Sequence, residues 1–255
     1  MKKKFLYFLP IVAVAMSVSC TKHYQLEGVQ RTRILIDSRY DKAPSAEATA
    51  FLAPFKHTVD SMMGPVVGKA ASYLEAAKPE SKLSNVLSDI LVWAAKDFNE
   101  KVDFSVYNIG GIRAALAEGI VTYGDVLEVA PFENKICFLD LSGEKVRELF
   151  EQIASRGGEG VSQGVRMSIS SLGQLNGVQV NGKDIDPQAT YRIATIDYLA
   201  QGNDGLVAFK ACTNVNSPQN EENNVRYIIM AYFRELYQQG KAVDGQVEGR
   251  ITVDE

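Results

Sequence analysis

The stretch FSVYNIGGIR, from Phe104 to Arg113, joins an apolar run to a turn of unusual composition. FSVY has the β-branched and aromatic residues of a buried strand, and AALAEG after the turn begins like a short helix. Between them lie the amide Asn108 and the glycines Gly110 and Gly111. Glycines allow a sharp turn and a close approach of the backbone to a neighbour, and the arginine just beyond can reach over that neighbour. Gly-Gly between a strand and a helix is usually only a turn, so the rest of the chain decides.

Outward from this stretch, helices and strands are mixed. Apolar periodicity and capping residues predict helices at 45–63, 81–98, about 123–129, from 142 onward and at 225–239. Alternating or apolar runs predict one or two strands within 24–37 and further strands at 65–70, 104–107, 135–141, 164–170, 177–182, 191–197 and 249–253. Asn181-Gly182 is typical of a hairpin turn. Because no steady βαβ alternation exists, the sequence predicts one mixed α+β domain over residues 45–255.

The first 20 residues resemble an export signal. MKKKFLYFLPIVAVAMSVSC has a basic start, a short apolar run and small residues before Cys20. The Ser19-Cys20 junction resembles a bacterial lipobox, so we expect Cys20 to be lipidated and to attach the chain to a membrane of the cell envelope; an ordinary cleaved signal is the alternative. Residues 21–44 are interpreted as an N-terminal arm.

Composition excludes some partners. The 255-residue chain has a net charge of −4 and no basic cluster after the signal, which argues against binding a nucleic-acid polymer. A hydrophobic fraction of 46% is enough for a packed core. Cys137 lies in an apolar strand and is expected as a buried thiol; whether it pairs with Cys212 stays open.

Residues typical of catalysis are scarce. The chain has two histidines, His23 and His57, and no His-x-His, HExxH, Cys-x-x-Cys, G-x-S-x-G or P-loop motif. We therefore expect no catalytic residue, no metal site and no cofactor within this chain.

Three stretches have the composition of binding elements. NIGGIR is the first, VAPFENK with Phe132 is the second, and TIDYLAQGNDGL with Tyr198 and Asp204 is the third. Two rings, a guanidinium and a carboxylate suit a nucleotide, because bases stack on aromatic faces and ribose hydroxyls donate to carboxylates. The alternative is that both rings are core residues and Asp204 only forms a turn.

Taken in order, these motifs resemble a known family. N-x-G-G-I-R, the later Pro-Phe pair and the run YRIATIDYLAQGNDG resemble the C-terminal domain of the 5′-nucleotidase family, which includes periplasmic UDP-sugar hydrolases and cell-surface ecto-5′-nucleotidases. The similarity covers roughly residues 65–255. In that family this domain binds the base and sugar of the substrate, and a separate N-terminal metallophosphatase domain with two metals performs hydrolysis.

The resemblance implies roles for the aromatic and acidic residues. Phe132 and Tyr198 would be the stacking rings, and Asp204 would hold ribose hydroxyls. Where the family has Gly-Gly-Asp-Gly, this chain has Gly202-Asn203-Asp204-Gly205.

It also implies roles for the first motif. Asn108 and Arg113 would contact the nucleotide, with Gly110 and Gly111 allowing close approach. The family has a further nucleotide-contacting arginine shortly before the first motif helix, whereas EAAKPESKLSN here offers only Lys78.

Three hypotheses follow. In the first, the chain is the substrate-binding half of a split 5′-nucleotidase or UDP-sugar hydrolase in nucleotide catabolism, and divalent metals belong to a separate metallophosphatase chain. In the second, it is a lipoprotein that binds nucleosides or nucleotides without hydrolysis. In the third, it is an interaction module that has lost the ligand. We favour the first.

Overall fold

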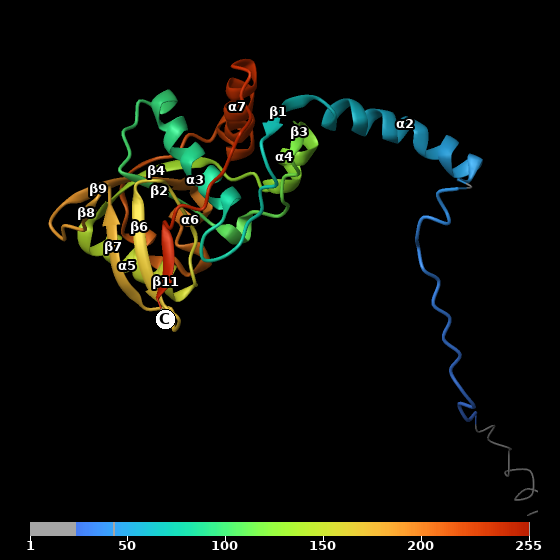
Figure 1. Cartoon of the computed structure of the whole chain (residues 1–255), viewed down its shortest axis with the longest axis horizontal. Coiled ribbons are helices and arrows are strands. Elements are labelled where there is room, and N and C mark those ends of the chain that lie inside the picture. Colours follow the sequence, from blue (N-terminus) through green and yellow to red (C-terminus); the bar gives the residue numbers. More distant parts are fainter. Residues whose placement is uncertain (1–23, 43, 255) are drawn as a thin grey trace, which may run out of the picture. The chain divides into compact units, whose positions relative to one another are not determined.

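A computed structural model describes residues 24–42 and 44–254 (Figure 1). The chain divides into two compact units, residues 1–51 and 52–255, and the boundary lies within helix α2 (Ala46–Met63). Among the described residues, none of the helices is both long and apolar enough to cross a membrane.

The strands predicted within residues 24–37 are wrong. Residues 24–36 form no regular structure, and their side chains are exposed. A strand is stable only beside a partner strand, and the described residues offer this segment none. The helix predicted from residue 45 is confirmed as α2, but its apolar stripe, including Leu52, Val59 and Met62, is exposed.

The described residues of the second unit form three sheets. A pair joins β1 (Val66–Ala70) to β3 (Gly119–Thr122). The central sheet has the order β10-β4-β9-β2-β5, with bounds Thr213–Asn216, Ile136–Ser142, Thr190–Ile196, Phe104–Tyr107 and Gly160–Val161. The third has the order β11-β6-β7-β8, with bounds Ile251–Asp254, Val165–Ser170, Leu175–Val180 and Lys183–Asp184.

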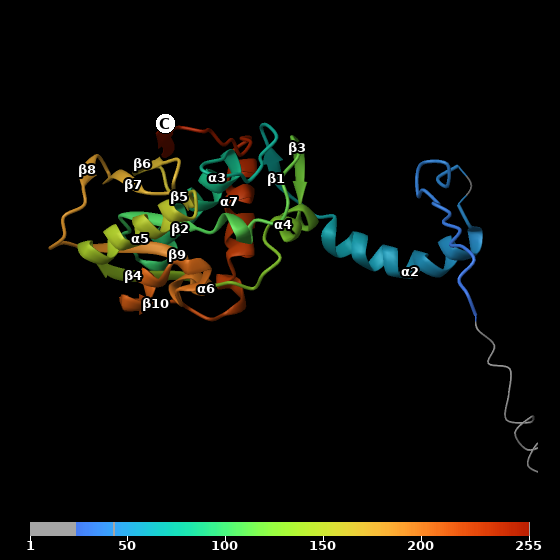
Figure 2. The same cartoon turned by 90° about the horizontal axis from the view of Figure 1, so that it is seen from below.

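Besides the end of α2, five α-helices accompany these sheets in the described part of the second unit (Figure 2). They are α3 (Lys82–Ala94), α4 (Tyr123–Val129), α5 (Gly143–Ser155), α6 (Asp197–Ala200) and α7 (Val225–Gln238). Short 3₁₀ turns are η1 (Ala95–Phe98), η2 (Ile109–Gly111), η3 (Asn203–Gly205), η4 (Val207–Ala211) and η5 (Glu221–Asn223). The predicted α+β class is confirmed.

Most predicted elements have their expected cause. The predicted cap Ser142 begins α5, and its hydroxyl accepts from the Lys145 N–H at 3.4 Å. Asn181 and Gly182 have φ of 52° and 75°, as a two-residue hairpin turn between β7 and β8 requires. The helix suggested by AALAEG is wrong, because Leu116 instead forms a β-bridge with Leu74 and the chain there is extended.

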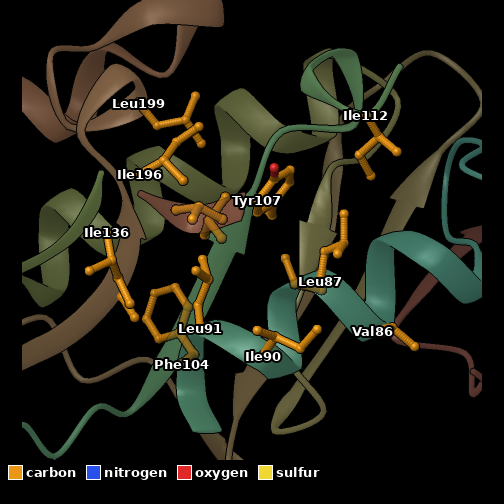
Figure 3. Close-up of a cluster of buried hydrophobic side chains, with 14 of the residues drawn as sticks. Val86, Leu87, Ile90, Leu91, Phe104, Tyr107, Ile112, Ile136, Ile196 and Leu199 are labelled. Atoms are coloured by element: carbon orange, nitrogen blue, oxygen red, sulfur yellow. The ribbon is translucent and has the colours of Figure 1, made fainter. Parts of the chain in front are cut away.

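Helices cover both faces of the central sheet. On β2, Ser105 donates its hydroxyl hydrogen bond to the Ser88 carbonyl of α3 at 2.6 Å, while the Phe104 ring lies 5.3 Å from the Phe150 ring of α5. Neighbouring residues of a strand point to opposite faces, so α3 and α5 pack on opposite sides. Burial on both faces explains why FSVY is continuously buried. Figure 3 shows part of this core, with side chains of α3, β2, β4 and β9 close together.

Strand register brings four segments to one edge of the central sheet. β2 and β9 are parallel neighbours, so both end at the same edge. β4 is antiparallel to β9 and begins there, with Ile136 opposite Ile196. β5 is antiparallel to β2 and also begins there, with Gly160 opposite Tyr107. The segments next to these strand ends therefore meet, although they are far apart in the sequence.

Candidate functional site

A cleft of about 230 Å³ lies at this edge of the sheet. It is lined by Asn108, Gly110, Gly111, Phe132, Asn134, Arg156, Tyr198 and Asp204. The structure thus brings six of the seven sequence-predicted binding residues to one cleft. Their roles in binding stay predictions.

Asn108 forms one wall of the cleft. Its side chain is buried and donates from Nδ2 to Asp204 Oδ2 at 2.7 Å. That bond orients the amide, and Oδ1 is left as a buried acceptor without a hydrogen-bond partner within the described structure. A buried polar atom without a hydrogen-bond partner costs folding free energy.

The two glycines of the first motif differ in what they do. A Cβ on Gly111 would lie 2.6 Å from Asn108 Oδ1, so only glycine leaves room for the amide. A Cβ on Gly110 would meet nothing within 4 Å, and neither glycine has positive φ. At Gly111, the expected close approach is therefore to the Asn108 side chain, within the protein. Gly110 places backbone without a side chain at the cleft.

Tyr198, in the short helix α6, and Asp204, in the turn that follows it, are linked by a hydrogen bond. The Tyr198 hydroxyl donates to Asp204 Oδ1 at 3.0 Å, and this bond to a carboxylate raises the pKa of Tyr198. Asp204 has a left-handed backbone, with φ of 54°, between Gly202 and Gly205. Asn203 donates its amide to the Tyr198 carbonyl at 2.8 Å and does not line the cleft. The extra side chain at 203 therefore secures the loop.

Phe132 is carried by a loop that a buried arginine holds. Arg226, at the start of α7, donates from Nε to the Ala130 carbonyl at 2.9 Å and from Nη2 to the Pro131 carbonyl at 2.7 Å. The Phe132 ring is 50% exposed and Tyr198 is 37% exposed. The interpretation of both rings as core residues is therefore wrong, and they are available to a ligand.

Arg113 is the predicted residue that does not line the cleft. Its side chain is exposed, and Nη1 donates back to the Gly110 carbonyl at 3.2 Å. Its backbone N–H bonds to the Val129 carbonyl at 3.0 Å, which ties the segment after the turn to α4. Contact between Arg113 and a ligand remains a prediction.

Three residues at the site were not predicted from the sequence. Asn134 lies in the stretch VAPFENK, two residues past Phe132. An amide side chain shortly after an aromatic residue in a loop is the sequence feature that could have identified it. Arg156 and Arg226 belong to helix ends whose neighbours across the sheet depend on topology. No local pattern marks them.

Metal ligands are not gathered among residues 24–42 and 44–254: no group of three or more His, Cys, Asp or Glu side chains there is arranged to hold an ion. Cys137 and Cys212 are free thiols, and burial raises the pKa of Cys137 to about 11. The lipidation expected at Cys20 lies outside the described residues.

Fold and cleft define an α+β domain with a ring-lined cleft where loops meet at one edge of a mixed sheet. The family model described as 5′-nucleotidase, C-terminal domain, matches residues 66–211. The chain belongs to this family. The family membership that the sequence motifs predict is confirmed.

Relatives agree with this assignment. The chain is 27% identical over 166 residues to protein UshA of Escherichia coli K12, and the matched region covers 64% of this chain and 30% of that protein. It is 28% identical over 239 residues to the trifunctional nucleotide phosphoesterase protein YfkN of Bacillus subtilis, covering 85% of this chain and 16% of that protein. The structure of a 5′-nucleotidase precursor from Thermus thermophilus has a TM-score of 0.70 and 27% identity over 81% of this chain and 43% of that one. The chain thus spans under half the length of each.

Proposed function

We propose that this chain binds the nucleoside part of a nucleotide and acts as the substrate-binding half of a split 5′-nucleotidase or UDP-sugar hydrolase type phosphoesterase. The observation that carries the proposal is the convergence on one cleft of Phe132, from the loop before β4, with Tyr198 and Asp204, from the segment after β9. Membership of the 5′-nucleotidase C-terminal domain family supports it.

The cleft has a partner for each part of a nucleoside. The half-exposed rings of Phe132 and Tyr198 offer flat faces to a base, each worth about 1–3 kcal/mol when a base stacks on it. Asp204 has about four lone-pair sites, of which Asn108 and Tyr198 use two, so ribose hydroxyls can donate to the others.

Cleft size favours a nucleoside whose phosphate lies outside. Pockets that enclose drug-sized ligands usually measure about 300–1,000 Å³. This cleft is smaller, at about 230 Å³, and its lining has one cation and one anion, Arg156 and Asp204. The lining therefore has no excess positive charge to bind a phosphate. We place the phosphate outside the cleft, on the side that faces a partner chain.

Hydrolysis is assigned to a separate metallophosphatase chain with divalent metals. The support is chemical: the described residues gather no metal ligands, and the two-metal chemistry of phosphate transfer needs them. The purified chain alone is then expected to release no phosphate from AMP, UMP or UDP-glucose with Mg²⁺, Mn²⁺, Co²⁺ or Zn²⁺. Metal-dependent release that survives removal of contaminating phosphatases contradicts this assignment.

A binding lipoprotein without hydrolysis is the second candidate, favoured by the same cleft. Thermal-shift measurements with nucleosides and nucleotides test the binding that both share, because a ligand of the folded state raises the melting temperature. A neighbouring metallophosphatase gene without a domain of this kind, whose product hydrolyses nucleotides only when mixed with this chain, separates the two.

We also propose a location in the cell envelope, with export directed by residues 1–20 and attachment through a lipid on Cys20. The support is the basic, apolar and small-residue order of that segment. Several acyl chains hold a protein on a membrane stably, whereas one does so only marginally.

A further inference from the structure

Arg156 enters the cleft from outside the three predicted loops. It caps the C-terminus of α5, and its side chain is 32% exposed. Nε donates to Glu159 Oε1 at 2.7 Å. A Cβ built on Gly205 would lie 3.8 Å from Arg156 Nη1. The guanidinium therefore extends from Glu159 to the turn that carries Asp204.

Glu159 fixes this position of Arg156. Its side chain is fully buried, with Oε1 accepting from Arg156 and, at 3.3 Å, from Lys78 Nζ. Oε2 accepts from the Ile109 N–H at 2.7 Å. A buried carboxylate with this many donors is costly to displace, so it holds the guanidinium by one edge. The Nη groups remain on the side of Gly205.

Lys78 does not act in the cleft. Its ammonium donates to the Arg156 carbonyl at 2.6 Å and to Glu159, and it does not line the cleft. Two cations and one carboxylate are thus packed together, and the cation that reaches the lining is Arg156. Beside it, Asp204 supplies the anion.

A fixed donor next to a fixed acceptor suits a vicinal diol. Each hydroxyl of a diol both donates and accepts, so one hydroxyl hydrogen can bond to the carboxylate while an oxygen of the same pair accepts from the guanidinium. A phosphate would gain from Arg156 but would meet the negative charge of Asp204. The pair therefore matches the two hydroxyls of a ribose better than an anionic group.

We propose that Arg156 is a ligand-contacting, specificity-determining residue that donates to a ribose hydroxyl oxygen while Asp204 accepts from the ribose hydroxyls. Glu159 is a positioning residue that holds the guanidinium. This inference rests on the proposed nucleoside-binding function.

The test is isothermal titration calorimetry of the full chain with adenosine, uridine and their 2′,3′-dideoxy forms. The wild type is expected to prefer the ribonucleosides. Arg156→Gln is expected to weaken ribonucleoside binding about tenfold, as loss of a hydrogen bond from a charged donor does, and to change dideoxynucleoside binding much less. Arg156→Lys keeps the charge but not the planar fork and is expected to lose most of the preference. Arg147→Gln, on the exposed side of the same helix, is the matched control and should leave both affinities unchanged.

Glu159→Gln is expected to reduce the preference for ribonucleosides over dideoxynucleosides, while binding of the base persists. A loss of stability alone would not change this preference. Circular dichroism melting checks that each variant is folded. If Arg156→Gln and Arg156→Lys weaken both sugars equally, or neither, the inference is overturned while the nucleoside site stands. If the wild type binds ribonucleosides and dideoxynucleosides equally, the site does not recognise the diol. The inference is then overturned while the nucleoside site stands. If the wild type binds none of the four probes, both the inference and the proposed function are wrong.

Discussion

Replacing Phe132 by alanine separates binding from stability. The ring is half exposed, so removal forfeits about half of the roughly 1.5–3 kcal/mol that full burial of a phenylalanine provides. About 1 kcal/mol of unfolding free energy is expected to be lost, which lowers the melting temperature by about 2–4 °C in a domain of this size. The carbonyls held by Arg226 are unchanged by the substitution, so the loop keeps its path.

Binding should suffer more than folding. Loss of one stacking face removes about 1–3 kcal/mol, a decrease in affinity of about 5- to 150-fold. Calorimetric titration with adenosine and uridine measures this, and differential scanning calorimetry measures the melting temperature of the same samples. Tyr73→Ala is the control, because Tyr73 is similarly exposed, at 56%, and lies outside the cleft.

Two outcomes refute the reasoning. Unchanged affinity in Phe132→Ala shows that no base stacks on this ring. A melting temperature lowered by about 10 °C or more shows that the ring supports the fold, and the exposed-face argument is then wrong.

Three further predictions concern other parts of the chain. Asp204→Asn is expected to weaken ribonucleosides about tenfold and 2′,3′-dideoxynucleosides less in calorimetry, and equal losses would remove the ribose role of this carboxylate. The Arg192 guanidinium, 2.7 Å from Glu100, lowers the pKa of Glu100 from its ordinary 4.5, so its stabilisation is complete above pH 4.5 and is lost as the pH falls below it. Glu100→Gln should cost about 1 kcal/mol in denaturant unfolding at pH 7 and the difference from wild type should shrink toward pH 3; a difference independent of pH would contradict this. Cys20→Ala should abolish fatty-acid labelling and membrane fractionation, and labelling that persists would exclude this cysteine as the anchor.

Secondary structure was predictable wherever the physical cause is local. The cap Ser142 and the Asn181-Gly182 turn each depend on neighbouring residues. The prediction of strands at 24–37 was wrong because an alternating pattern is only one requirement of a strand. The other requirement is a partner strand, and the sequence of the segment itself does not reveal whether one exists. AALAEG failed because Leu116 pairs with Leu74, a contact that overrides helix propensity.

The candidate site was predictable to the extent that its residues fall in recognisable motifs. Asn108, Phe132, Tyr198 and Asp204 belong to such motifs and line one cleft. Arg156 belongs to none, since its place beside Asp204 arises from β5 running antiparallel to β2. The register of four strands therefore decides which cation the cleft contains, and no single stretch of sequence specifies that register.

The same register has a kinetic consequence. The Asn108–Asp204 hydrogen bond joins residues 96 apart in sequence, and Thr195 bonds to the Val106 carbonyl 89 residues away. Closing loops of this length is slow compared with forming a helix, so these pairings are completed late in folding. Under the proposed function, a nucleoside binds only to molecules that have finished folding. Such a ligand leaves the folding rate unchanged and slows unfolding, and its binding reports what fraction of the molecules has completed folding.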